Sequence, residues 1–141
     1  MENQSEIIFI PNKPSKIERN NIMALNPSSD LRDVSGIDDA SKTLIKAFMQ
    51  GAIYSWVKNR MGEPFAVRDL VGGENFDWDE TPLIVLYEKH IRQGKDNISA
   101  IKAAARDLGW LVKSVLAEDK RTFLAGKVGL VNSYRWVGGE P

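Results

Sequence analysis

The sequence of 141 residues contains no cysteine, which excludes disulfide bonds, thiolate metal sites and a thiol nucleophile. It has a single histidine, His90, so no zinc site can be built from several histidines or cysteines. No apolar run approaches the roughly 18 residues that a membrane-spanning helix needs. The only apolar run near the acidic N-terminus, residues 7–10, is too short for a secretory signal. We therefore expect a cytoplasmic protein with no membrane segment, no metal and no cofactor.

The motifs of common enzymes are missing as well. The glycine pairs at residues 72–73 and 138–139 lack the spacing and the following Lys-Ser/Thr of a phosphate-binding loop. Nothing beyond the presence of the residue types indicates a Ser, His and acid constellation. A nuclease that uses a few carboxylates and a lysine stays open, but no feature of the sequence points to one. We therefore predict no catalytic residues.

The net charge is zero, with 19 basic and 19 acidic residues, but the charges are distributed unevenly. From residue 82 to the end there are ten Lys/Arg and six Asp/Glu, whereas residues 37–81 carry five and eight. Such an asymmetry can direct one face toward a polyanion, and it can equally arise by chance in a short chain. The length predicts one domain. We assign residues 1–36, which prolines interrupt, to a flexible N-terminal arm, and residues 37–141 to a single helical domain.

Residues 37–61 are predicted to form a long helix, because apolar residues recur at helical spacing throughout. Asp38 and Asp39 stand at its start, where negative charge suits the helix dipole, and Gly62 and Pro64 end it. Its two apolar rows are Leu44, Phe48, Ala52 and Trp56, and Ile45, Met49, Ile53 and Val57. This face is wider than one partner helix covers. The helix is therefore either the spine of the domain, which we favour, or the surface of a homodimer.

The middle of the chain contains a short helical stretch and an acidic loop. Residues 66–71 favour one or two helical turns. Residues 74–80 place four carboxylates around Phe76 and Trp78, a grouping that could suit a hard cation. The loop lacks the glycine and the closing glutamate of a calcium site. We therefore interpret it as a solvated loop whose aromatic residues pack on the core.

A second helix is predicted over residues 82–93, with Thr81 as its cap and Pro82 at its first position. His90 falls on its buried stripe. We interpret His90 as a packing residue rather than a catalytic one, because no second His or Cys can build a site with it. Lys89, Arg92 and Lys95 are expected on the outer side of this helix.

The following residues favour two short helices, 98–108 and 110–120, separated by a turn at Gly109. Strand-forming residues fill the C-terminal stretch, interrupted by glycines and by an Asn-Ser pair. These residues predict a β-hairpin. It turns either near residues 126–129 or, more tightly, at residues 132–133.

This arrangement resembles the helix-turn-helix of winged-helix DNA-binding domains. Ala105 matches the small residue at which the two helices cross, Gly109 the turn, and Val115 the apolar anchor six residues further on. Glu118 departs from the pattern, which has an apolar residue at that position. The resemblance implies a mainly α, winged-helix-like fold with a small C-terminal β-hairpin. It also implies a DNA-binding regulator of transcription.

The winged-helix resemblance permits a second register. In that register helix 37–61 is the first helix, residues 66–71 form the second, and the helix after Thr81 is the third. The hairpin is the wing in both registers. They differ in which helices form the helix-turn-helix.

The resemblance further implies which residues bind DNA. The expected surface is the solvent face of residues 110–121 with the hairpin beside it, and the preceding helix could add phosphate contacts. Its basic and polar residues are Lys102, Arg106, Lys113, Ser114, Lys120, Arg121, Lys127 and Arg135. These residues could equally form a solvated face, because Glu118 and Asp119 lie among them. We expect a nucleic-acid-binding protein that forms a homodimer through helix 37–61.

The rival hypothesis is a helical protein–protein interaction module that has this shape without binding nucleic acid. Large aromatic or apolar side chains would then mark the partner surface. The candidates are Trp56, Trp78, Trp136 and residues 7–10. The two hypotheses differ in whether the basic residues fall on one continuous face.

Overall fold

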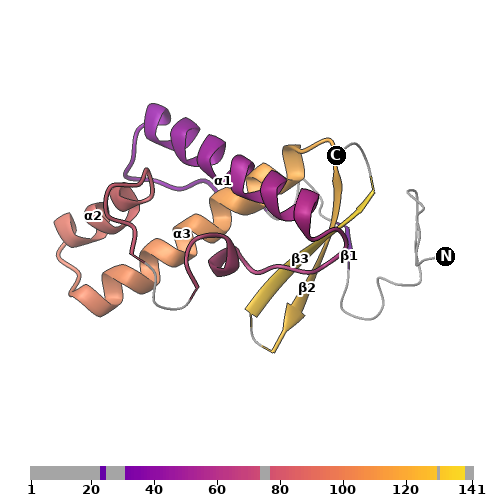
Figure 1. The fold of residues 1–141 in the computed structure, drawn as a ribbon. Coiled ribbons are helices and arrows are strands. Elements are labelled where there is room, and N and C mark those ends of the chain that lie inside the picture. Colours follow the sequence, from indigo (N-terminus) through magenta and orange to yellow (C-terminus); the bar gives the residue numbers. More distant parts are fainter. Residues whose placement is uncertain (1–22, 25–30, 74–76, 130, 139–141) are drawn as a thin grey trace.

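The computed structural model describes residues 23–24, 31–73, 77–129 and 131–138 of the chain (Figure 1). Its elements, in chain order, are β1 (Met23–Ala24), α1 (Asp39–Asn59), the 3-10 helix η2 (Val67–Leu70), α2 (Ile84–Arg92), α3 (Asn97–Glu118), β2 (Thr122–Val128) and β3 (Val131–Gly138). The prediction of a mainly helical protein with a C-terminal antiparallel hairpin is confirmed. The predictions for residues 7–10 and for Glu74 and Phe76 lie outside the described residues.

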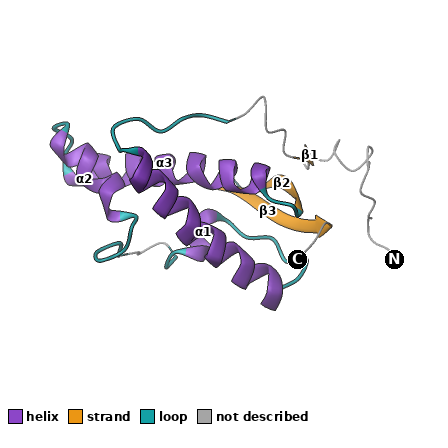
Figure 2. Ribbon diagram, turned by 90° about the horizontal axis from the view of Figure 1, so that it is seen from above, coloured by secondary structure: helices purple, strands orange, loops and turns teal. Residues whose placement is uncertain are grey.

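The long helices α1 and α3 form the body of the protein, with the hairpin at one end and α2 at the other (Figure 1, Figure 2). Aromatic rings fill the core at the hairpin end. The Phe65 ring lies 6.2 Å from that of Phe123 and 6.1 Å from that of Tyr134, measured between centroids. The backbones of Phe65 and Tyr134 also exchange two N–H to carbonyl hydrogen bonds, each 2.8 Å long. This bridge attaches the segment after α1 to β3.

Helix α1 begins and ends close to the predicted residues. The carboxylate of Asp38 caps it by accepting a hydrogen bond from the Ser41 N–H at 2.8 Å, which lowers the pKa of Asp38 below its usual value. One predicted apolar row, Ile45, Met49, Ile53 and Val57, is fully buried, so α1 is the spine of the domain. In the neighbouring row, Leu44 is 57% exposed and Phe48 is 40% exposed. The apolar face of α1 is therefore wider than the core that it covers.

The packed fold includes residues before the predicted domain boundary at 37. Val34 is buried in the core, and the Asp33 carboxylate lies 2.8 Å from Lys42 Nζ on α1. Strand β1 pairs with β2 in antiparallel fashion, with Met23 opposite Ala125. These contacts attach parts of the predicted arm to the domain.

Helix α3 is one continuous helix of 22 residues, so the predicted turn at Gly109 is wrong. Gly109 has a helical backbone and not the positive φ of a helix end. Buried residues continue on both sides of the glycine: Ala104, Leu108, Leu111, Val112 and Val115. Burial of each large apolar side chain contributes about 1.5–3 kcal/mol, which exceeds the roughly 1 kcal/mol that one glycine costs a helix. The continuous apolar stripe therefore determines the length of α3.

Replacing Gly109 by alanine is expected to stabilise the protein by about 1 kcal/mol, because alanine favours a helix and its Cβ would meet no atom within 4 Å. Urea unfolding followed by tryptophan fluorescence measures this change. Gly94, which lies between α2 and α3 with a φ of +95°, is the matched control. Gly94→Ala should destabilise the protein, because a side chain is strained at that φ. A Gly109→Ala variant that is less stable than the wild type would contradict a continuous α3 and indicate that a helix ends at Gly109.

Helix α3 packs mainly against α2, and residues 93–96 join the two helices. The first predicted register divides residues 98–120 between two helices. It is wrong in this respect, because α3 is continuous from Asn97 to Glu118. The second register assigned a helix to residues 66–71. The structure has the short η2 in that stretch and two α-helices after it. Among the described residues, three α-helices thus precede the hairpin.

The hairpin turns where the first of the two predictions placed it. Gly129 lies in the turn between β2 and β3 with a φ of +64°, which glycine adopts at low steric cost. The alternative turn at residues 132–133 is wrong, because both residues lie within β3.

The strand register decides which hairpin residues share a face. Lys127 on β2 pairs with Asn132 on β3, and cross-strand partners project to the same side of a sheet. Side chains alternate along a strand, so Asn132 and Tyr134 lie on one face and Arg135 on the other.

Candidate functional site

The solvent-facing side of α3 carries a row of cations with small residues between them. This row, termed the basic stripe, consists of Lys102, Ala105, Arg106, Gly109 and Lys113. Each member is three or four residues from another, as in the pairs 102/106, 105/109 and 109/113, so they share one helix face. Lys102, Ala105 and Arg106 are exposed, and Gly109 and Lys113 are half-buried. Because alanine and glycine have little or no side chain, the helix backbone stays accessible between the cations.

The carboxylates at the C-terminal end of α3 point away from the basic stripe. Glu118 lies 3.9 Å from Lys46 Nζ on α1. The Asp119 side chain is fully buried and accepts a hydrogen bond from Gln50 Nε2, also on α1, at 2.7 Å. Both acids therefore contact α1, although in sequence they lie among the predicted DNA-binding residues.

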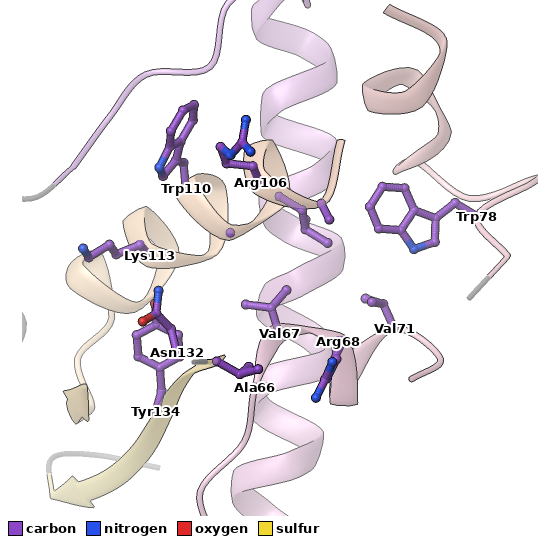
Figure 3. A pocket seen from close by; sticks show the side chains of 14 residues that line it. Ala66, Val67, Arg68, Val71, Trp78, Arg106, Trp110, Lys113, Asn132 and Tyr134 are labelled. Carbon is purple, nitrogen blue, oxygen red and sulfur yellow. The ribbon is translucent and has the colours of Figure 1, made fainter. Parts of the chain in front are cut away.

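A groove with a volume of about 330 Å³ lies between α3, η2 and β3 (Figure 3). We term it the α3–η2 groove. Arg106 and Lys113 of the basic stripe line it from α3, and Arg68 lines it from η2. Its aromatic lining consists of Trp78, Trp110 and Tyr134. The groove thus places three cations and three aromatic rings around one open space.

The structure brings together part of the predicted DNA-binding set. Lys102, Arg106 and Lys113 lie on the basic stripe. Lys127 pairs with Asn132, which lines the α3–η2 groove, so Lys127 projects to that side of the hairpin. Arg68 and Trp110 also line the α3–η2 groove, although the sequence predicted neither of them to bind DNA.

The other predicted residues lie elsewhere or are already engaged. Ser114 is half-buried, and its hydroxyl donates to the Glu118 carboxylate at 3.4 Å. Lys120 is exposed just beyond the end of α3. The Arg121 side chain is 8% exposed, 3.2 Å from Asp119 and 3.8 Å above the Tyr54 ring. Arg121 therefore attaches the end of α3 to α1, and Arg135 projects from the opposite face of the hairpin from Asn132.

A second group of charged residues is buried between α2 and α3. The Asp107 carboxylate lies 2.8 Å from Lys89 Nζ and 2.7 Å from His90 Nε2. Lys89 Nζ also donates to the backbone carbonyl of Ser35. The prediction that Lys89 lies on the outer side of its helix is wrong, because the segment before α1 covers that side. Gly36 in that segment is so close that an added Cβ would lie 2.9 Å from Lys89 Cδ.

This buried cluster joins α2, α3 and the segment before α1. His90 is buried, as its interpretation as a packing residue predicts. The three residues are between 4% and 8% exposed, and none of them lines the α3–η2 groove. A signal for the cluster was present in the sequence. Asp107 precedes Leu108 within the apolar stripe of α3, and a carboxylate in such a position needs a cationic partner.

Residues 77–80, the described part of the acidic loop before α2, form a turn in which Glu80 has a φ of +62°. Asp77, Asp79 and Glu80 are exposed, and the Asp77 carboxylate accepts a hydrogen bond from the Asp79 N–H at 2.9 Å. Trp78 is 5% exposed and packs on the core, as predicted. Within the part of the chain that the structure describes, no group of three acidic or histidine residues is arranged to hold a metal ion.

Among the described residues, no helix combines the length and the apolar character needed to cross a membrane. Comparisons with protein-family models, with curated proteins and with solved structures found no significant match to this chain. The basic stripe, the α3–η2 groove and the exposed Leu44 and Phe48 on α1 are therefore the features from which a function can be argued.

Proposed function

We propose that this chain is a cytoplasmic nucleic-acid-binding protein that acts as a transcriptional regulator and presents α3 and the hairpin to DNA. The basic stripe is the observation that carries the proposal. Its three cations, Lys102, Arg106 and Lys113, lie on one face of α3, and the carboxylates of α3 lie elsewhere. Cations arranged in this way neutralise successive phosphates. The winged-helix order of three helices and a hairpin supports the same function.

The shape of α3 suits a DNA groove. An α-helix with its side chains is about 10–12 Å across, and the major groove of B-DNA is about 12 Å wide. Ala105 and Gly109 would let the helix backbone approach the base edges, while Arg106 and Lys113 reach phosphates or guanine edges. Lys127, near the tip of the hairpin, would contact the neighbouring DNA backbone.

Fluorescence anisotropy with a labelled random-sequence duplex tests this proposal. Binding through cations releases counterions, so the affinity should fall steeply between about 50 mM and about 200 mM salt. Absence of binding at the lower salt concentration, by protein that circular dichroism shows to be folded, would overturn the proposal.

We also propose that the protein forms a homodimer through α1. Leu44 and Phe48 are exposed on this helix, and a Cβ added to the exposed Gly51 would meet no atom within 4 Å. The glycine would therefore let a second copy of α1 approach closely.

The Phe48→Asp variant is expected to be monomeric in analytical ultracentrifugation at micromolar concentrations where the wild-type protein is dimeric. A carboxylate at this position would be buried without a partner in the dimer. Ile91→Asp is the control, because Ile91 is 41% exposed but lies on α2. A wild-type protein that stays monomeric, or a Phe48→Asp variant that still dimerises, would contradict this proposal.

The exposed Leu44 and Phe48 on α1 also favour the second candidate function, a helical protein–protein interaction module that does not bind nucleic acid. Trp56, one of the predicted partner-binding residues, already donates its indole N–H to the Glu63 carbonyl at 3.1 Å and stacks with Arg60 at 4.9 Å. Leu44 and Phe48 are therefore better markers of a partner surface. Under this function the duplex would not bind at any salt concentration, and Phe48→Asp would still abolish association.

A further inference from the structure

We propose that the α3–η2 groove binds a small aromatic anion, meaning one or two fused rings that carry a carboxylate, sulfonate or phosphate group. Its volume of about 330 Å³ lies at the lower end of the roughly 300–1,000 Å³ typical of ligand sites. This volume fits a compact molecule and not a dinucleotide-sized one. The charge of the groove, the residues of its walls and the glycine at its floor each indicate a property of the ligand.

The charge of the groove favours an anion. Arg68, Arg106 and Lys113 line it, and no Asp or Glu is among its described lining residues. The cations come from two elements, since Arg106 and Lys113 project from α3 and Arg68 from η2 (Figure 3). Guanidinium groups bind carboxylates, sulfonates and phosphates through paired, charge-assisted hydrogen bonds. An acidic group at the open edge of the groove would therefore lie near a cation, either Arg106 or Lys113 on the α3 side or Arg68 on the η2 side.

The walls of the groove favour a flat apolar ring. Trp110 presents aromatic surface to the groove, and Val67 and Val71 present aliphatic surface, since all three are half-buried. Trp78, Tyr134 and Leu108 line it from behind and are 5%, 4% and 1% exposed. Aromatic rings in such a site bind other rings by offset stacking or edge contacts. The Arg32 guanidinium lies 5.6 Å from the centre of the Trp110 ring, which orients the indole and adds a positive charge beside the groove.

Gly109 keeps the groove open. It lines the groove from the middle of α3, and a Cβ added to it would meet no atom within 4 Å. Glycine is unfavourable inside a helix, and neither a positive φ nor a close approach of another segment requires it here. A larger side chain at this position would project into the open space. The fold does not require a glycine at position 109. Keeping the groove accessible explains why the residue is a glycine.

Ligand binding goes beyond the proposed nucleic-acid binding and does not depend on it. Arg106 and Lys113 belong to both the α3–η2 groove and the basic stripe. A bound anion would neutralise these cations, so ligand and duplex should compete. Only this competition rests on the proposed function.

Titration of the full chain with anilinonaphthalene sulfonate, a fused aromatic ring system with one acidic group, tests the proposal. Isothermal titration calorimetry should show saturable binding at one site per chain. In a parallel fluorescence titration, the emission of the probe should rise as it binds. The uncharged analogue phenylnaphthylamine should bind about tenfold more weakly or worse, because it makes no charge-assisted contact. Equal binding of the two probes, or no saturable binding of the sulfonate, would overturn the proposal.

Two glycine variants locate the bound probe. Gly109→Leu keeps every charge, fills the groove and should weaken sulfonate binding about tenfold or more. Gly51→Leu is the matched control, because Gly51 is also a helical glycine with no atom within 4 Å of an added Cβ, but it lies on α1. This variant and Phe48→Asp should bind the probe as the wild type does. Unchanged binding by a folded Gly109→Leu variant, or loss of binding in either α1 variant, would place the probe elsewhere and refute the assignment.

The probe titration contains no nucleic acid, so its failure is distinguishable from a failure of the proposed function. Binding of the sulfonate without binding of a duplex would leave the ligand site standing alone. Binding of both, with displacement of the labelled duplex by the sulfonate in wild-type protein, would support competition at Arg106 and Lys113. Binding of both without displacement would refute the competition and keep the ligand site.

Discussion

The Asp107→Ala variant is expected to lose about 3–5 kcal/mol of unfolding free energy, the cost of leaving a buried charge without its partner. In the native protein, Lys89 Nζ and His90 Nε2 lie 2.8 Å and 2.7 Å from one Asp107 carboxylate oxygen. Removal of that carboxylate leaves the buried ammonium group of Lys89 with the Ser35 carbonyl alone among its described partners. Urea unfolding followed by tryptophan fluorescence measures the loss. The midpoint of thermal unfolding should fall by about 10 °C or more.

The double variant Lys89→Met/Asp107→Leu separates the pairing from the packing. Replacing a buried ion pair by apolar residues of similar size is often neutral, so the double variant should recover most of the stability lost in Asp107→Ala. If the double variant is as unstable as Asp107→Ala, the carboxylate does not stabilise the protein by pairing with Lys89. An Asp107→Ala variant within about 1 kcal/mol of the wild type would show that the cluster does not hold α2 to α3.

The triple variant Lys102→Gln/Arg106→Gln/Lys113→Gln is expected to weaken duplex binding about a hundredfold or more at low salt. Each of the three cations would neutralise one phosphate. The slope of the logarithm of affinity against the logarithm of salt concentration should therefore fall by about three. Anisotropy titrations over a series of salt concentrations measure both quantities. The folded state should be unaffected, because Lys102 and Arg106 are exposed and Lys113 is half-buried at the edge of the groove.

The matched control is Lys46→Gln/Lys120→Gln/Arg135→Gln, which removes the same charge away from the basic stripe. Lys120 and Arg135 belong to the DNA-binding surface that the sequence predicts, but neither lies on that stripe. The control should bind the duplex within about threefold of the wild type, because long-range charge effects are screened at moderate salt. Equal losses in the two triple variants would mean that net charge alone, and not the stripe, determines binding.

The helical framework was largely predictable, because local periodicity determines it. In α1 the apolar residues repeat over the whole helix, and Asp38 supplies the cap that starts it. What the pattern could not show is which apolar row faces the core. Ile45 and Leu44 are equivalent in a helical pattern, yet Ile45 is fully buried and Leu44 is 57% exposed. That difference depends on where α3 and the hairpin pack.

Gly109 shows why the predicted turn between residues 98–108 and 110–120 is wrong. A glycine that ends a helix and a glycine within one look alike in sequence, and the distinction depends on the residues around it. Leu108 and Leu111 lie on either side of Gly109 and share one buried stripe, which keeps the helix continuous. The apolar periodicity across the glycine was therefore a better guide than the glycine itself.

The candidate site was predictable only where it lies on a single element. Lys102, Arg106 and Lys113 share a helix, and their spacing alone places them on one face. The α3–η2 groove adds Arg68 and Trp78, which come from segments whose position depends on tertiary contacts such as the bridge of Phe65 with Tyr134. The pairing of Lys89 with Asp107 also depends on how α2 packs against α3. No local pattern contains that information.

The most direct test of nucleic-acid binding through α3 is a map of backbone amide chemical shifts in isotope-labelled protein, recorded by NMR with and without a duplex. The account predicts shifts concentrated on the basic stripe of α3, on η2 and around Lys127, with α1 unchanged. Shifts confined to α1, or a spectrum that the duplex leaves unaltered at low salt, would contradict it.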